Sequence, residues 1–137
     1  MKKLTLALAL ILLLSGSAMA QEFNKFSMDI AAGWTCVEDG SVLIVAPNKE
    51  AAVSIAFNTV EGVTAEATAC EFSKKLKGSE PRLEKDDTYS FTFTSNGVKS
   101  TSYCSLKNNR LMLITVTDPT GKYGAAIQQM LATLKEK

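Results

Sequence analysis

Thiols and carboxylates are the side chains that could do chemistry in this chain, because the sequence contains no histidine. Without an imidazole, neither a serine nor a cysteine nucleophile can be activated in the usual way, and the common zinc motif is absent. The sequence also lacks a glycine-rich phosphate loop and a Gly-x-Gly-x-x-Gly turn after a strand. We therefore predict no catalytic residue, no cofactor, no metal ligand and no enzymatic activity.

The three cysteines, Cys36, Cys70 and Cys104, are the reactive set of the chain. Their odd number leaves at least one thiol unless a partner chain supplies another, and three single pairings are open. We predict a disulfide between Cys70 and Cys104, because a helix that carries Cys70 could lie on the strand that carries Cys104. Cys36 would then be a buried free thiol that behaves as a small hydrophobic side chain. A redox-active thiol is the alternative, although the chain has no Cys-x-x-Cys motif.

The strand that carries Cys104 belongs to a predicted three-stranded meander over Thr88–Thr117. Asn96-Gly97 and Asn108-Asn109 both favour two-residue turns, because Asn and Gly tolerate the positive φ angles that such turns need. If both loops have two residues, the register is fixed. The expected partners are Ser95 with Val98, Phe93 with Ser100, Phe91 with Ser102, Tyr89 with Cys104, Leu106 with Leu111, and Cys104 with Leu113.

The remaining strands are predicted before the meander. Alternating or continuous apolar runs, separated by turn residues, indicate strands over Phe26–Ile30, Trp34–Glu38, Val42–Ala46 and Ala51–Phe57. Asp39-Gly40 predicts a type I′ turn between the second and third of these strands. The strand Val42–Ala46 is apolar at every position, so we expect it to be central and covered on both faces.

Two amphipathic helices are predicted, one in each half of the chain. The first starts at the N-cap Thr64 and stops at Gly78, with a buried stripe of Ala65, Ala69, Phe72 and Leu76. The second opens at 118–120, with a stripe of Tyr123, Ile127, Met130 and Leu134, widened by Ala126 and Leu131. The predicted fold class is α+β: an antiparallel sheet of about six strands flanked by two helices, an α/β/α sandwich.

Two further groups of residues have a structural and a functional interpretation. Glu80, Glu84, Asp86 and Asp87 lie in a charged connector, where the spacing of a calcium loop is missing and a solvated segment is the better interpretation. Tyr103 shares a predicted sheet face with Met112 and Ile114, and a shallow apolar groove would form there if the second helix covered it incompletely. Packing in the core is the alternative.

The first 20 residues have the pattern of a secretory signal peptide. Two lysines precede an apolar run over 4–14, and Ala18-Met19-Ala20 predicts cleavage after Ala20. We expect a periplasmic or secreted bacterial protein with a single domain over 21–137 and no membrane span after cleavage. No cysteine stands directly after the apolar run, where a lipid would be attached, so the protein is not expected to be a lipoprotein. Removing Lys2 and Lys3 takes the formal charge from +1 to −1, which gives no case for nucleic-acid binding.

The order of these features resembles the superfamily of the photosystem II protein PsbP and the bacterial envelope protein DcrB. The resemblance rests on Phe26–Ile30, Gly33-Trp34, the apolar strand Val42–Ala46, the helix that starts at Thr64, the Asn96-Gly97 meander and the terminal helix around Met130. It implies an α/β/α sandwich and an accessory or binding protein without shared catalytic residues. DcrB-like proteins look like lipoproteins, and this chain departs from them in lacking the lipidation cysteine.

We therefore predict a small exported accessory or binding protein, whose partner is an envelope protein or a small apolar ligand. Two alternatives remain open. One is a structural homo-oligomer formed through a sheet edge, with Phe26–Ile30 or a flanking strand pairing with its copy. The other is an enzyme that uses carboxylates or a thiol alone, for which a pair of carboxylates in a cleft would be the sign.

Overall fold

The structure, a computed structural model, describes residues 19–137. The leader predicted over residues 1–20 lies outside this part except for Met19 and Ala20. The described chain forms two compact units, one of residues 35–123 and one of residues 19–34 with Gly124–Lys137. The single domain predicted over 21–137 stays a prediction.

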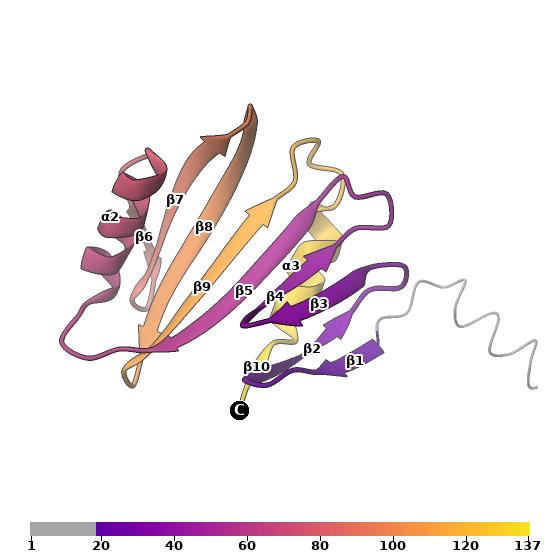
Figure 1. The fold of residues 1–137 in the computed structure, drawn as a ribbon, viewed down its shortest axis with the longest axis horizontal. Coiled ribbons are helices and arrows are strands. Elements are labelled where there is room, and N and C mark those ends of the chain that lie inside the picture. Colours follow the sequence, from indigo (N-terminus) through magenta and orange to yellow (C-terminus); the bar gives the residue numbers. More distant parts are fainter. Residues whose placement is uncertain (1–18) are drawn as a thin grey trace, which may run out of the picture. The chain divides into compact units, whose positions relative to one another are not determined.

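The larger unit contains a seven-stranded sheet with the order β3-β4-β5-β9-β8-β7-β6 (Figure 1). All neighbouring strands run antiparallel. With the two helices of the described residues, this confirms the α+β class, although ten strands form there instead of about six. The elements of the larger unit are β3 (Thr35–Asp39), β4 (Ser41–Val45), β5 (Ala52–Thr59), α2 (Ala65–Leu76), β6 (Arg82–Lys85), β7 (Thr88–Ser95), β8 (Val98–Lys107) and β9 (Arg110–Thr117).

The meander of β7, β8 and β9 has the predicted register. Both turns hold two residues with positive φ, Asn96-Gly97 at 53° and 78° and Asn108-Asn109 at 52° and 63°. These turns fix the pairing, because side-chain direction alternates along each strand. All six predicted partner pairs, from Ser95 with Val98 to Cys104 with Leu113, are present.

The turn between β3 and β4 differs from its prediction. A two-residue loop at Asp39-Gly40 would pair Glu38 with Ser41, but Glu38 pairs with Val42 and Asp39 with Ser41. Of the two turn residues only Gly40 has a positive φ, at 79°, whereas a type I′ turn needs two. The hairpin therefore centres on Gly40, and the predicted type I′ turn is wrong.

The apolar strand β4 is covered on one face and not on both. Val42 and Ile44 are buried, whereas Leu43 between them is 42% exposed. A continuous apolar run is typical of a strand buried on both sides, but β4 lies next to the edge strand β3. The prediction that it is central and doubly covered is therefore wrong.

Helix α2 packs on β7 and β8, and its start is the predicted one. The Thr64 hydroxyl accepts a hydrogen bond from the Ala67 amide at 3.0 Å and so caps the helix. Ala65 and Ala69 are buried as predicted, but Ser73 is buried in place of Leu76, which is exposed. The helix ends at Lys77 in the left-handed conformation, and the Gly78 amide donates to the Ser73 carbonyl.

The charged connector contains a strand that the sequence prediction missed. Arg82–Lys85 forms β6 and pairs with β7, and Asp86 and Asp87 make the intervening turn with φ of 42° and 58°. Aspartate is among the few residues that tolerate this conformation, so Asp86-Asp87 is a turn signal and not only a solvated charge pair.

The smaller unit is a three-stranded sheet, β1-β2-β10, with the helix α3. Its elements are β1 (Met19–Glu22), β2 (Phe26–Ile30), α3 (Gly124–Ala132) and β10 (Lys135–Glu136). The Thr133 hydroxyl accepts a hydrogen bond from the Asp29 amide at 2.8 Å, which ties the end of α3 to β2. Of the predicted stripe of this helix, Ile127 and Met130 are buried. The helix begins at Gly124 and ends at Ala132, so the predicted opening at 118–120 is wrong and Tyr123 and Leu134 lie outside the helix.

Strand β2 is the central strand of this small sheet, with β1 on one side and β10 on the other. Both of its edges are therefore occupied over part of their length, and the suggestion that Phe26–Ile30 pairs with its copy through an open edge is not supported. The edge strands of the two sheets remain as candidates for such pairing, β1 and β10 in the smaller sheet and β3 and β6 in the larger one.

Candidate functional site

Direct cross-strand partners in an antiparallel sheet point to the same side, so the pairing defines two faces of the seven-stranded sheet. Phe91 shares a buried cluster with Ala69 of α2, which identifies the face that α2 covers. We call it the α2 face. One row of partners crosses this face: Val37, Leu43, Ser54, Thr115, Ser102 and Phe91.

The opposite face carries a recess of about 380 Å³ beside Tyr103, which we call the Tyr103 recess. Strand pairing explains which side chains line this recess. Ser90 pairs with both Arg82 and Tyr103, which brings these three side chains to the same side of the sheet. The lining residues are Ser79, Arg82, Glu84, Ser90, Phe91, Thr92, Thr101 and Tyr103.

Glu84 is the acidic side chain of the Tyr103 recess, and it contacts two polar partners there. Its Oε2 accepts a short hydrogen bond from the Ser90 hydroxyl and lies 3.5 Å from the Arg82 Nη2. The Ser90 hydrogen bond, followed by the Arg82 charge, lowers the pKa of Glu84 below its ordinary value. A carboxylate with a lowered pKa stays ionised at neutral pH, so it can accept hydrogen bonds but is poorly suited to general acid–base work.

Hydroxyl groups line the rest of the Tyr103 recess. The Ser79 Oγ accepts a hydrogen bond from the Thr92 amide at 2.9 Å and lies 3.3 Å from the Thr92 hydroxyl, which fixes the segment before β6 against β7. Within residues 19–137, we find no hydrogen-bond partner for the hydroxyls of Thr101 and Tyr103. These two groups are therefore available to a ligand.

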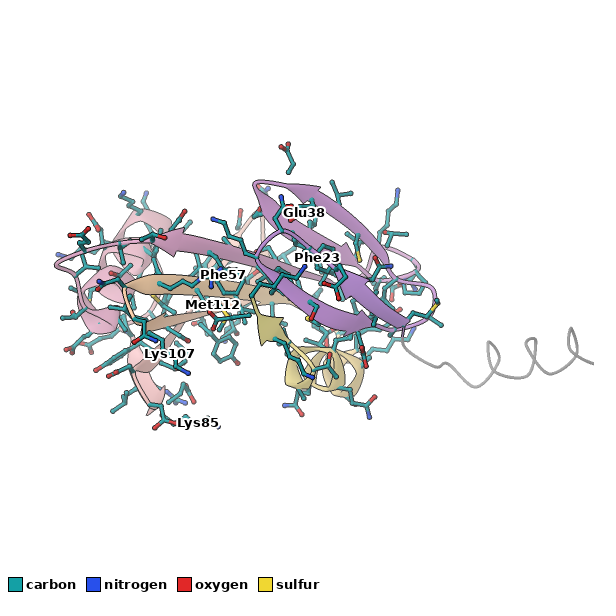
Figure 2. All side chains as sticks on the ribbon, turned by 90° about the horizontal axis from the view of Figure 1, so that it is seen from below. Phe23, Glu38, Phe57, Lys85, Lys107 and Met112 are labelled. Atoms are coloured by element: carbon teal, nitrogen blue, oxygen red, sulfur yellow. The ribbon has the colours of Figure 1, made fainter. Side chains whose placement is uncertain are left out.

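The predicted groove near Tyr103 thus exists as a concave site, but its composition differs from the prediction. Met112 pairs with Phe57 of β5, and Figure 2 shows these two side chains next to each other. Neither Met112 nor Ile114 lines the Tyr103 recess, which receives the polar side chains of β6 instead. The sequence prediction missed Arg82 and Glu84 because it assigned them to a connector.

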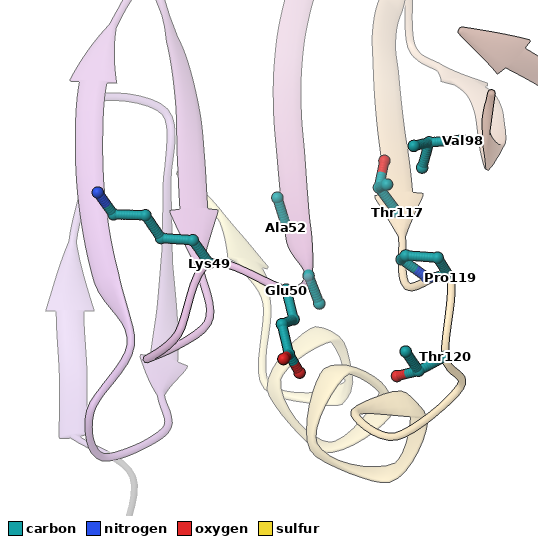
Figure 3. A pocket seen from close by; sticks show the side chains of 8 residues that line it. Lys49, Glu50, Ala52, Val98, Thr117, Pro119 and Thr120 are labelled. Atoms are coloured by element: carbon teal, nitrogen blue, oxygen red, sulfur yellow. The ribbon is translucent and has the colours of Figure 1, made fainter. Parts of the chain in front are cut away.

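A second, shallower cavity of about 370 Å³ lies at the end of the sheet where β9 stops, and we call it the Val98 cavity. Figure 3 shows Val98, Thr117 and Pro119 close together, while the Lys49 side chain points away from them. The Tyr123 hydroxyl donates to the Asn48 Oδ1 at 2.8 Å, so the turn after β4 is joined to the segment after β9. The lining residues are Lys49, Glu50, Ala51, Ala52, Val98, Thr117, Pro119 and Thr120.

The three cysteines are free thiols in the structure, so the disulfide predicted between Cys70 and Cys104 is not supported. Ala69, and not Cys70, belongs to the buried cluster that contains Cys104. Residues one step apart on a helix point about 100° apart, which turns Cys70 away from this cluster.

Burial also makes two of the thiols poor nucleophiles. It raises the pKa of Cys104 to about 11 and raises the pKa of Cys36, which is half-buried. Because the thiolate is the nucleophile, both groups are weakly reactive at neutral pH.

Among residues 19–137, no group of three or more acidic or cysteine side chains is arranged to hold a metal ion. In the same part of the chain, neither helix has the length and apolar character needed to cross a bilayer.

Comparison with known proteins identifies the fold. The solution structure of cyanobacterial PsbP (CyanoP) from Synechocystis sp. PCC 6803 matches with a TM-score of 0.60 at 9% identity, over 89% of this chain and 94% of that protein. The fold is PsbP-like. A protein from Bacteroides thetaiotaomicron VPI-5482 matches with a TM-score of 0.53 at 22% identity, over 82% of this chain. The PsbP-like chain spans only 45% of the length of the Bacteroides protein.

Neither a protein-family model nor a curated protein sequence matches the chain. At these identities the two structural likenesses establish the fold alone. The resemblance to DcrB stays a prediction.

Proposed function

We propose that the chain is a small exported accessory protein of the bacterial cell envelope that acts by binding and not by catalysis. The leader-like first 20 residues, the absence of histidine and the PsbP-like fold support this proposal. The observation that carries it is the Tyr103 recess, in which an aromatic ring, an ion pair and several hydroxyls converge on one side of a sheet.

The composition of the Tyr103 recess favours a neutral ligand rich in hydroxyl groups, such as a sugar. Arg82 contributes donors, ionised Glu84 contributes acceptors, and their charges cancel, so neither an anion nor a cation is preferred. The half-buried Tyr103 ring offers an apolar surface on which the C–H groups of a ring-shaped ligand can lie. The hydroxyls of Thr101 and Tyr103 complete the polar contacts.

Titration of the isotope-labelled protein with neutral sugars, glucose and N-acetylglucosamine among them, tests this proposal by NMR. We expect amide shifts at Ser90, Thr101 and Tyr103, and binding weakened about tenfold or more by Tyr103→Ala and by Arg82→Gln. Lys107→Gln, at the last residue of β8 and outside the lining of the recess, is the matched control and should leave binding unchanged. Figure 2 shows the Lys107 side chain. Absence of binding to every sugar tested, or equal binding by Tyr103→Ala, would overturn the proposal.

A small apolar ligand, or an envelope protein that presents an apolar side chain, is the second candidate. Ala51, Ala52, Val98 and Pro119 give the Val98 cavity its apolar lining and support this candidate. Cyclohexanol is a suitable probe. If Val98→Asp abolishes its binding while Tyr103→Ala leaves that binding intact, the apolar ligand class is favoured over the sugar class.

A further inference from the structure

Strand β3 forms one end of the seven-stranded sheet and pairs there with β4 alone (Figure 1). An edge strand directs alternate N–H and C=O groups outward, where another strand can pair with them. All residues of β3 except Cys36 are exposed. Its register with β4 is unbroken over Thr35–Asp39, so the edge is straight enough to act as a template.

Strand β6 at the other end of the sheet carries the protection that natural edge strands use. Arg82, Glu84 and Lys85 place three charges in four residues, and the register shifts between Leu83 and Lys85. Charges and irregular pairing both discourage the addition of a further strand. Strand β3 carries two acidic residues, Glu38 and Asp39, but has no lysine, arginine or proline and no such shift, so it is the less protected edge of the sheet.

An exposed apolar pair lies at this less protected edge. Val37 is the middle residue of β3 and is 60% exposed, and its direct partner Leu43 on β4 is 42% exposed. Both side chains lie on the α2 face. A strand added beside β3 would remove this pair from water, which is favourable by roughly 25 cal/mol per Å² of apolar surface.

We propose that the protein forms a symmetric homodimer in which β3 pairs antiparallel with β3 of a second copy, with the twofold axis at Val37. In this register Val37 faces its own copy, and Leu43, Val37 and the same two residues of the second copy form one apolar row on the α2 face. Thr35 faces Asp39 of the other copy, to which its hydroxyl can donate, and Cys36 faces Glu38. The two sheets then continue as one.

The charges of β3 disfavour one of the two neighbouring registers that keep the same faces together. Moving the register by two residues toward the C-terminus would put Glu38 opposite its own copy, and like charges directly opposite each other are destabilising. Moving it by one residue would place side chains on the wrong faces. With Val37 at the axis, each acidic side chain of β3 meets an uncharged partner from the same five-residue strand, so a second copy satisfies the edge without any other protein.

Sedimentation velocity at increasing protein concentration tests the dimer. We expect the unmodified protein to associate as concentration rises, and Val37→Lys to remain monomeric because a lysine at the axis would face its own copy. Leu83→Lys is the matched control, since Leu83 is 61% exposed, lies on the edge strand β6 and shares the α2 face through its partner Tyr89. It should associate like the unmodified protein. A monomer at every concentration, or equal loss in both variants, would overturn the proposal.

Cross-linking tests the register independently of stability. In a Cys36→Ser background, Val37→Cys should give a disulfide-linked dimer with an added oxidant, because directly opposed Cα atoms lie about 4.5–5.5 Å apart, within the range of a disulfide. Thr35→Cys in the same background should not, since it faces Asp39. A cross-link through Thr35→Cys in place of Val37→Cys would refute this register.

Discussion

At its β7–β8 end the seven-stranded sheet buries the face that carries Phe91, whereas at its β3–β4 end it buries the face that carries Ile44. Helix α2 covers the first of these regions, and Tyr103 on the reverse side stays accessible in its recess. At the other end, the α2 face leaves Val37 and Leu43 in contact with water. One continuous sheet therefore offers two different surfaces, a polar recess at one end and an apolar edge at the other.

Under the two proposals above, this difference would separate two kinds of recognition on a single sheet. A polar recess with an ion pair and hydroxyls suits a small ligand, which must satisfy each polar group that it covers. An apolar edge with exposed backbone suits a strand from another chain. The following predictions test whether the two ends differ as described.

The largest expected contrast is between two neighbours in β4. Ile44→Ala should lower the free energy of unfolding by about 2–5 kcal/mol, because Ile44 is fully buried. Leu43→Ala should lower it by less than about 1 kcal/mol, because Leu43 is largely in water. Urea unfolding of both variants measures this. Equal losses would mean that β4 is covered on both faces, as its sequence alone suggests.

Substitution of Gly78 tests how closely α2 packs on the β7–β8 end of the sheet. A Cβ at this position would lie 2.5 Å from the Thr92 carbonyl oxygen, so Gly78→Ala forces the end of α2 away from β7 and should cost about 1–3 kcal/mol. Gly124→Ala is the control, because nothing lies within 4 Å of its Cβ position, and it should be neutral or slightly stabilising. Thermal unfolding compares the two. A neutral Gly78→Ala would show that α2 does not approach β7 this closely.

The cap of α2 gives a smaller effect. Thr64→Ala removes the acceptor of the Ala67 amide and should cost about 1 kcal/mol. Thr94→Ala, on β7 without a cap role, is expected to change stability by less than about 0.5 kcal/mol. Urea denaturation of both variants measures the two free energies of unfolding. If Thr64→Ala costs nothing, Thr64 is not the N-cap of α2.

Thiol counting tests the cysteines without changing stability. We expect all three cysteines to be alkylated in denaturant without reductant, as free thiols are in the structure, and Cys104 to react last under native conditions because it is buried and its pKa is about 11. Intact mass spectrometry gives the count. If only Cys36 were alkylated, this would instead support the predicted disulfide between Cys70 and Cys104.

The smallest expected effect is the titration of Glu84. Ser90→Ala removes the hydrogen bond that lowers the pKa of this carboxyl, so its pKa should rise toward the ordinary value. Because the pKa is lowered in the folded state, the associated stability is present at neutral pH and is lost as pH falls through the folded pKa. Carboxyl NMR titration of both proteins measures the change, and an unaltered pKa would show that Ser90 does not hold Glu84.

The parts of the fold that the sequence predicts well are those with a local cause. Asn96-Gly97 sets the whole β7–β8 register, and Thr64 sets the start of α2, because each acts through the backbone of its own neighbours. The cover of β4 could not be predicted, since it depends on which elements reach Leu43 in space. The Tyr103 recess was only half predictable, because Arg82 and Glu84 reach it through the pairing of β6 with β7.

Strand β1 has a consequence for the order of events in the cell. Ala20, after which the leader is proposed to be removed, lies inside β1 and pairs with Asp29. A peptidase that cleaved after Ala20 would have to compete with β2 for this stretch of backbone. If the leader is removed at this bond, cleavage has to come before β1 pairs with β2, and a precursor that folds first would protect this bond from cleavage.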